Sequence, residues 1–312
     1  MKNIMQISSM LLAAVISLST QGITAVVETI SGNEGTMVNS IQYDNKKDET
    51  KDNAAWSYVY FGSYPQNEVK DGAVIYAIDK AIEKCGTIAD TGMDVWVNGV
   101  KYRRISKNDT NNIRYFDDMS NNGYRYFKWE RIKWKVLKND GNTLFVVTDR
   151  AIDCKDYNEE FKSITWETST IRDWLNTSFY NTAFSNNEQS AIVTQNVVNE
   201  DHPYYGTEGA NNTSDKIYLL SISEVTNETY GFCSDYGTVS MSRGIKASDY
   251  ANARGTWSLR GNNSAYEGNC DWWLRSPYAM YVTSDGYINW DGALVNDDSV
   301  GICPALHINI LY

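Results

Sequence analysis

The chain has 312 residues, of which 42% are hydrophobic and 13% aromatic, and this composition predicts a folded globular protein rather than a disordered one. Its formal net charge is −11, and nucleic-acid binding needs a basic surface that neutralises phosphates. We therefore expect no nucleic-acid partner.

The first 25 residues have the pattern of a secretory signal peptide. Lys2 supplies a short positive region, residues 10–18 supply the apolar core, and Gly22 and Ala25 offer cleavage positions. We expect a secreted or cell-surface protein with a signal peptide over 1–25; the alternative is an uncleaved N-terminal anchor. No later stretch is apolar for long enough to span a bilayer. Residues 26–55 are polar and charge-rich, which predicts a disordered linker.

The folded domain is expected over residues 56–312. Residues 58–66 predict a strand, and apolar residues at helical spacing predict a helix over 74–85. Asn98-Gly99 predicts a hairpin over 95–102. The Asn- and Asp-rich residues 105–123 predict a loop, and strands are expected over 124–129, 132–137 and 143–148.

The middle of the chain predicts three short helices, each with a serine or threonine start signal. The first follows Thr168 or Ser169, and capping boxes begin the other two at Ser185 and Ser221. Residues 231–269 are rich in Gly, Ser and Asn and predict long surface loops.

The C-terminal part begins with the adjacent Trp272 and Trp273. Neighbouring residues of a strand point to opposite faces, so we expect one ring in the core and the other under a loop. Pro277 should end this strand or place it at an edge. Asp285-Gly286 and Asp291-Gly292 predict hairpin turns, and residues 300–308 predict a buried last strand.

Three motifs in this order resemble a bacterial domain family of unknown function. They are Phe-Gly-Ser-Tyr-Pro-Gln at 61–66, Trp-Trp-Leu-Arg-Ser-Pro at 272–277 and Gly-Ile-Cys-Pro-Ala-Leu at 301–306. That family is assigned to the C-type-lectin-like fold, with formylglycine-generating-enzyme-like domains and the variable proteins of diversity-generating retroelements. The resemblance covers roughly residues 56–310 and implies an α+β domain with short antiparallel strands, a few helices and long loops.

The resemblance also implies structural roles for the residues that form the family's signature. These are Trp272, Trp273, Leu274, Arg275, Pro277 and Pro304. Cys303 stands where the family has arginine, so no role of that arginine carries over. Because the resemblance makes the signature strand and the terminal strand neighbours, we expect a disulfide between Cys270 and Cys303. The chain has five cysteines, and this odd count leaves at least one thiol unpaired.

No catalytic residue, metal site or cofactor is predicted. The two histidines, His202 and His307, lie in a loop and in an apolar strand, and the cysteine spacings match neither a zinc site nor the cysteine pair of formylglycine-generating enzymes. Solvated acidic turns are expected at Asp285, at Asp291 and over 296–298. Calcium bound by their oxygens is the alternative.

The segment between Pro277 and Val300 carries the functional hypothesis, because Tyr and Trp give large contact areas and Asn and Asp adaptable hydrogen bonds. The predicted ligand-binding residues are Tyr278, Tyr281, Tyr287, Asn289, Trp290, Asp291, Asn296, Asp297 and Asp298. We expect a binding protein rather than an enzyme, with a protein or glycan ligand at the cell surface. The alternatives are a cell-envelope glycan hydrolase that uses loop carboxylates and a non-catalytic structural surface protein. Similarity to retroelement variable proteins adds the hypothesis that these loops are diversified.

Overall fold

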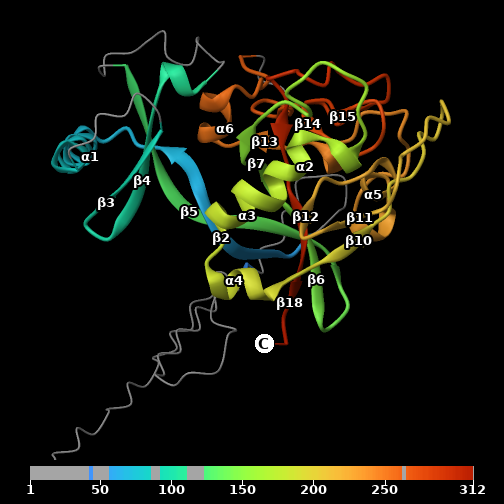
Figure 1. Ribbon diagram of the computed structural model, residues 1–312, viewed down its shortest axis with the longest axis horizontal. Coiled ribbons are helices and arrows are strands. Elements are labelled where there is room, and N and C mark those ends of the chain that lie inside the picture. Colours follow the sequence, from blue (N-terminus) through green and yellow to red (C-terminus); the bar gives the residue numbers. More distant parts are fainter. Residues whose placement is uncertain (1–41, 45–55, 86–91, 111–122, 262–264, 312) are drawn as a thin grey trace, which may run out of the picture.

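The computed structural model describes residues 42–44, 56–85, 92–110, 123–261 and 265–311 (Figure 1). The predicted signal peptide and most of the predicted linker lie outside these residues, as does most of the predicted loop over 105–123. The described chain is α+β, and most strand pairs are antiparallel; the parallel pairs are β13 with β7 and β14 with β17. None of the helices in the described ranges is both long and apolar enough for a membrane span.

The largest sheet is built on two long antiparallel strands, β2 (Tyr58–Glu68) and β5 (Tyr124–Asn139). Its main path runs β1-β2-β5-β6-β18-β12. The other strands of this path are β1 (Gln42–Asp44), β6 (Thr143–Thr148), β18 (Ala305–Asn309) and β12 (Ile217–Tyr218). The prediction of two strands over 124–129 and 132–137 is wrong: Glu130 and Arg131 pair with residues of β2, so the ladder continues across the expected break.

A smaller body lies at one end of this sheet (Figure 1). It contains helix α1 (Gly72–Lys84), strands β3 (Met93–Val97) and β4 (Val100–Ser106), and the first half of β5. The predicted helix and the predicted Asn98-Gly99 hairpin are confirmed here. Ile78 and Ile82 of α1 are buried with Val95 and Tyr126 in a small core of their own.

The larger body packs short helices beside the sheet (Figure 1). They are α2 (Thr170–Trp174), a π-helical turn (Leu175–Phe179), α3 (Tyr180–Ala183), α4 (Asn186–Ala191), α5 (Ile222–Val225) and α6 (Asp249–Arg254). The predicted starts are confirmed: Ser169 accepts a hydrogen bond from the Arg172 N–H, and complete capping boxes begin at Ser185 and Ser221. The short 3-10 turns are Lys107–Asp109, Trp166–Thr168, Glu228–Tyr230 and Met241–Arg243.

A second sheet has the order β16-β15-β14-β17-β8. Its strands are β16 (Ile288–Asn289), β15 (Tyr281–Val282), β14 (Trp272–Trp273), β17 (Gly301–Ile302) and β8 (Asp153–Cys154). Both tryptophans of β14 are fully buried, and their indole N–H groups donate to the carbonyls of Arg243 and Lys155. Asp285-Gly286 forms the predicted hairpin turn between β15 and β16.

The chain from Val300 to Ile308 is not one strand, as predicted, but two. β17 belongs to the second sheet and β18 to the large sheet, so the chain passes from one sheet to the other at Cys303-Pro304. β9 (Ile192–Val193) joins the large sheet on β18. Two further sheets have two strands each: β10 (Gln195–Val197) with β11 (Thr213–Asp215), and β13 (Lys246–Ala247) with β7 (Arg150–Ala151).

The prediction of surface loops over 231–269 holds for residues 234–239, which form an exposed loop, but it is wrong for residues 240–254. This stretch holds β13, α6 and a fully buried arginine, Arg243, and Ala251 and Ala253 of α6 have no exposed surface. Small residues dominate the stretch because they allow close packing against the second sheet, a role that composition alone does not distinguish from that of a loop.

The predicted disulfide between Cys270 and Cys303 is also wrong, because all five cysteines are free thiols. Their strands are neighbours, but Trp272 pairs with Gly301 in parallel register. Cys270 lies two residues before the paired position and Cys303 two residues after it, so the two thiols are displaced in opposite directions along the strands. Burial raises the pKa of both thiols.

Candidate functional site

Five aromatic side chains from three separate stretches meet at the surface. This group, the aromatic face, consists of Tyr204, Tyr205, Tyr236, Tyr278 and Trp290. Tyr204 is 68% exposed and the other three tyrosines are 48–49% exposed. The rings form a continuous row in the order Tyr236, Trp290, Tyr204, Tyr205, Tyr278. The centroids of neighbouring rings in this order are 5.2, 5.3, 4.9 and 5.5 Å apart.

A buried histidine holds two of these stretches together. His202 is 1% exposed, and its Nδ1 accepts hydrogen bonds from the backbone N–H groups of Tyr204 and Tyr205. Its Nε2 lies 3.0 Å from the carbonyl oxygen of Trp290. Because Nδ1 accepts, the ring proton is on Nε2, which donates to that carbonyl. One imidazole therefore fixes the positions of three rings of the face.

Asp291 provides a carboxylate beside the rings. It is exposed, and the Tyr205 hydroxyl donates to its Oδ1 at 2.5 Å. This hydrogen bond is the main cause of the raised pKa of Tyr205. The phenol therefore stays protonated, and the pair offers both a donor and an acceptor at the surface.

The backbone that carries Tyr278 is strained. Tyr278 and Ala279 have positive φ angles of 70° and 48°, a region that side chains other than glycine disfavour. Gly292, at φ 72°, packs against them so closely that a Cβ there would lie 1.7 Å from the Tyr278 carbonyl oxygen. The Asp291-Gly292 pair therefore locks two loops together. The prediction that it forms a hairpin turn between strands is wrong.

The loop that presents Tyr236 is held from below by Arg243. This side chain is fully buried and donates to three carbonyl oxygens between residues 233 and 238, and also to that of Gly286. Burial lowers the pKa of Arg243 from its ordinary value. The four acceptors compensate for the loss of water around the guanidinium, so the arginine rigidly supports one end of the face.

A groove of about 400 Å³ runs beside the aromatic face. Tyr278 belongs to both, Asp291 lines the groove beside the face, and the exposed side chains Phe161 and Leu294 extend the groove with apolar surface. The face and the groove together form a continuous surface with polar groups at its edges.

The structure places three of the nine predicted ligand-binding residues, Tyr278, Trp290 and Asp291, at the face. Tyr281 and Asn289 instead form a hydrogen bond to each other across the β15–β16 hairpin. Tyr287 lies at the end of the turn of this hairpin, directly before β16. The remaining three lie in the next turn: Asn296 is exposed, Asp297 accepts a hydrogen bond from the Ser299 N–H, and Asp298 borders a different pocket.

Tyr204, Tyr205 and Tyr236 were not among the residues predicted from the sequence, and His202 was predicted only to lie in a loop. The one local signal was a tyrosine pair between Pro203 and Gly206, a turn that presents both rings. Tyr205 and Asp291 are 86 residues apart, and no local spacing rule relates them.

No three His, Cys, Asp or Glu side chains within the described ranges are grouped so that they could hold a metal ion. Carboxylates of the acidic turns accept hydrogen bonds within their own turns. Asp285, for example, uses Oδ1 to accept hydrogen bonds from the Thr283 hydroxyl and the Tyr287 N–H within its own turn.

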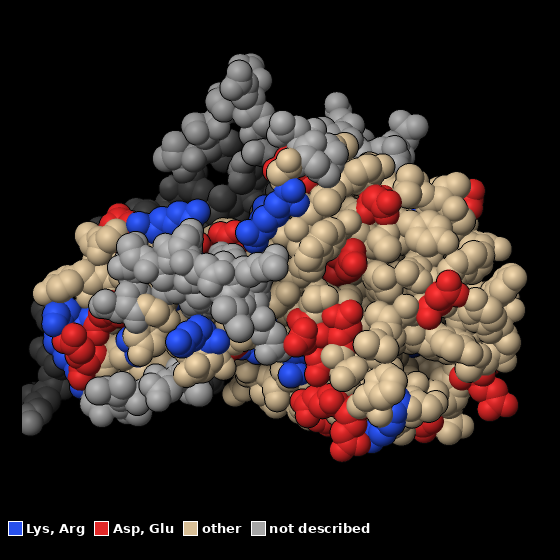
Figure 2. Space-filling view, turned by 90° about the horizontal axis from the view of Figure 1, so that it is seen from above, with Lys and Arg blue, Asp and Glu red and all other residues tan. Residues whose placement is uncertain are grey.

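Charge is unevenly distributed on the surface seen in Figure 2. Acidic side chains are scattered over the larger body, whereas basic side chains lie mostly over the smaller body. On the side of the larger body that this view shows, acidic side chains thus clearly outnumber basic ones.

Comparison with known proteins identifies one match. A family model described as a domain of unknown function (DUF6273) matches residues 140–310, which is 171 of the 312 residues. No curated protein and no solved structure matches the chain. Because the match covers more than half of the chain and includes every residue of the aromatic face, we conclude that this protein belongs to the DUF6273 family.

Proposed function

We propose that this chain is a binding protein that holds a hydroxyl-rich glycan on the aromatic face. The observation that carries the proposal is the unbroken row of four exposed tyrosines and the partly buried Trp290, whose loops are held by the buried side chains of His202 and Arg243. Contiguous exposed aromatic surface typically marks an interaction site, and rigid Tyr and Trp side chains bind at low entropic cost.

The chemistry of the face favours a glycan over other ligands. Aromatic rings offer flat apolar surface to the C–H faces of sugar rings, while the Tyr205–Asp291 pair offers a donor and an acceptor to hydroxyl groups. The acidic surface of the larger body disfavours anionic ligands. A protein ligand is the other outcome that the experiments must distinguish.

We further propose that the frame is a C-type-lectin-like fold and that the protein acts outside the cell. The α+β architecture with mostly antiparallel strands supports the first proposal, and the signal-like residues 1–25 support the second. Detection of the processed chain in culture medium or on intact cells would test the location. A chain found only in the cytoplasm would contradict it.

Co-sedimentation with insoluble polysaccharides tests the binding function. Cellulose, xylan, chitin and peptidoglycan would each be incubated with the purified protein. We expect at least one to retain the wild type, and the double variant Tyr204→Ala/Trp290→Ala to bind about ten-fold more weakly, as expected for the loss of hot-spot rings.

The control variant is Tyr76→Ala/Trp96→Ala. These two side chains are 64% and 66% exposed and lie on the smaller body, so they match the test variant in residue types and match Tyr204 in exposure. Equal loss of binding in both double variants would contradict the proposed site. Retention of the wild type by none of the four materials would count against a polysaccharide ligand.

We also propose that the exposed part of the face is diversified within the coding population. Tyr278 and Asp291 are exposed, whereas Trp272 and Trp273 have no exposed surface, so changes at the first pair would spare the frame. Deep sequencing of the segment for residues 276–299 in a clonal population tests this. Substitutions crowded at the exposed positions are expected, and a uniform segment would rule out diversification.

A further inference from the structure

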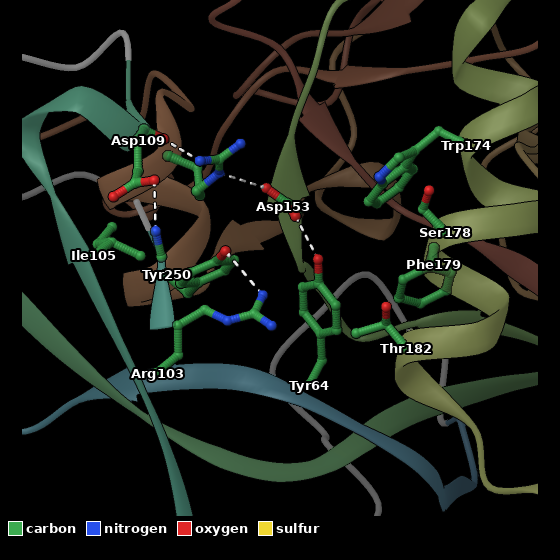
Figure 3. Close-up of a pocket in the computed structure, with 12 residues that line it drawn as sticks. Tyr64, Arg103, Ile105, Asp109, Asp153, Trp174, Ser178, Phe179, Thr182 and Tyr250 are labelled. Atoms are coloured by element: carbon green, nitrogen blue, oxygen red, sulfur yellow. Dashed lines mark hydrogen bonds and ion pairs between the residues drawn. The ribbon is translucent and has the colours of Figure 1, made fainter. Parts of the chain in front are cut away.

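A second cavity, of about 310 Å³, lies where β2 and β4 approach α2, the π-helical turn, α3 and α6 (Figure 3). We term it the polar pocket. It is lined by Tyr64, Arg103, Asp153, Trp174, Tyr250 and Arg254, among others. None of its lining residues belongs to the aromatic face.

One wall is organised by a buried carboxylate. Asp153 is 3% exposed and accepts hydrogen bonds from the Tyr64 hydroxyl at 2.6 Å and from Arg254 Nε at 3.3 Å. Burial and the negative charge of Asp153 raise the pKa of Tyr64, so its phenol remains a donor. A buried charge that is paired and hydrogen-bonded in this way is held in one geometry.

The next wall holds Arg103 equally firmly. Its Nε and Nη2 donate to the two oxygens of Asp94, at 2.8 Å and 2.9 Å, and its Nη1 donates to the Tyr250 hydroxyl at 3.3 Å. Asp94 is also paired with Lys101. Burial opposes the charged form of Arg103, but these hydrogen bonds outweigh it and its pKa is raised.

The opposite wall is helical and carries unused polar groups. Trp174, Ser178 and Thr182 follow one another at steps of four residues, so they share the face that lines the pocket (Figure 3). A π-helical turn, a feature frequent at functional sites, lies between Trp174 and Thr182. Within the described ranges, the hydroxyls of Ser178 and Thr182 have no hydrogen-bond partner.

The charges of the pocket indicate a neutral ligand. Two arginines, Arg103 and Arg254, and two carboxylates, Asp109 and Asp153, are the charged residues among its described lining. These charges balance, so neither an anion nor a cation gains a net attraction. A free carboxylate or ammonium group would face one repulsive partner for each attractive one.

Hydroxyl groups both donate and accept, which suits walls that combine guanidinium donors with carboxylate and hydroxyl acceptors. The rings of Tyr64, Phe179 and Trp174 add apolar surface, and the volume is at the lower end of the usual range of about 300–1,000 Å³ for small-molecule sites. We propose that the polar pocket binds a neutral sugar of one or two rings, separately from the aromatic face.

Thermal-shift and tryptophan-fluorescence titrations test this proposal. The probes are glucose, galactose, N-acetylglucosamine and cellobiose, with the anion glucuronate and the cation choline as charged comparators. We expect saturable binding of at least one neutral sugar and about ten-fold or weaker binding of the charged comparators. Ser178→Leu, which fills the pocket from an exposed position, should weaken sugar binding at least ten-fold without lowering the melting temperature.

Two further variants separate the pocket from the proposed glycan site. Tyr204→Ala/Trp290→Ala should leave these titrations unchanged, and Thr182→Val should weaken them, since it removes only a hydroxyl. Three results would overturn the proposal: no neutral sugar binds, a charged comparator binds more tightly than every neutral sugar, or Ser178→Leu binds like the wild type. Loss of sugar binding in the aromatic-face variant would assign the sugar to that face instead.

Discussion

At the scale of single residues, the two histidines occupy structural positions of different kinds. His202 lies beneath the aromatic face and joins its loops, whereas His307 stacks on Phe145 at 4.5 Å and shares a hydrogen bond with the Tyr218 hydroxyl. Neither contacts a nucleophile or a metal ligand in the described part of the chain. Their roles follow from burial, which residue type alone does not reveal.

His307 predicts a pH dependence of stability. Burial lowers its pKa to about 4, whereas an unfolded histidine titrates near 6.5. Between these values the unfolded state binds more protons than the native state. The stability that the neutral, buried His307 contributes is therefore complete above about pH 6.5 and is lost as the pH falls toward about 4. The free energy of unfolding would be measured in urea at pH 7 and pH 4.5. Between these two pH values, the wild type should lose about 2 kcal/mol more of it than His307→Gln. Equal losses would contradict the buried neutral histidine.

At the scale of elements, glycines decide whether two loops can touch. Gly292 and Gly99 both have positive φ angles, 72° and 79°, but only Gly292 is crowded; a Cβ on Gly99 would meet no atom within 4 Å. Gly292→Ala should therefore displace the Tyr278 loop and weaken glycan binding by about ten-fold or more. Gly99→Ala should cost only about 1 kcal/mol of backbone strain and leave binding intact.

Fluorescence-monitored binding and urea unfolding of both glycine variants provide the measurement. Binding by Gly292→Ala at the wild-type level would show that the packing of the two loops does not shape the site. A similar loss of binding in Gly99→Ala would indicate a general effect on folding instead.

The elements that the sequence predicted well are those with local signals. The caps at Ser169, Ser185 and Ser221 and the turn at Asn98-Gly99 depend on residues within a few positions of each other. The continuous strand β5 depends on its partner β2, and the register that separates Cys270 from Cys303 depends on β14 lying beside β17. Such pairings are long-range, and periodicity within one segment does not contain them.

The same distinction applies to the candidate site. Tyr278, Trp290 and Asp291 could be predicted, because a polar-aromatic stretch after a buried strand is a local signal. Tyr204, Tyr205 and Tyr236 join them through direct ring contacts and through the buried side chains of His202 and Arg243. All of these partners are distant in sequence from residues 278–291.

At the scale of the whole molecule, the two proposed sites relate differently to the family match. The aromatic face lies entirely within residues 140–310. The polar pocket does not, because Tyr64 and Arg103 lie outside that range. Its other principal residues lie inside it: Asp153, Trp174, Tyr250 and Arg254. The pocket therefore needs the segment before the matched region to complete its walls. The face does not use lining residues from that segment.

The chain's passage between the two sheets at Cys303-Pro304 links these parts. β17 pairs with β14, next to the face, and β18 pairs with β6 in the large sheet. The frame thus carries the exposed loops on buried strands, and the exposed tyrosines of the face can change without altering the core, against which only Trp290 of the face packs. This separation of frame and surface is what a binding protein requires.

The most direct test of glycan binding by the aromatic face is an array that displays both glycans and peptides. Wild type and Tyr204→Ala/Trp290→Ala would be applied side by side at equal concentration, after equal melting temperatures had been verified. We expect the wild type to give a signal on neutral glycans, and this signal to fall about ten-fold or more in the variant. Signal confined to peptides, or glycan signal of equal strength in both proteins, would contradict it.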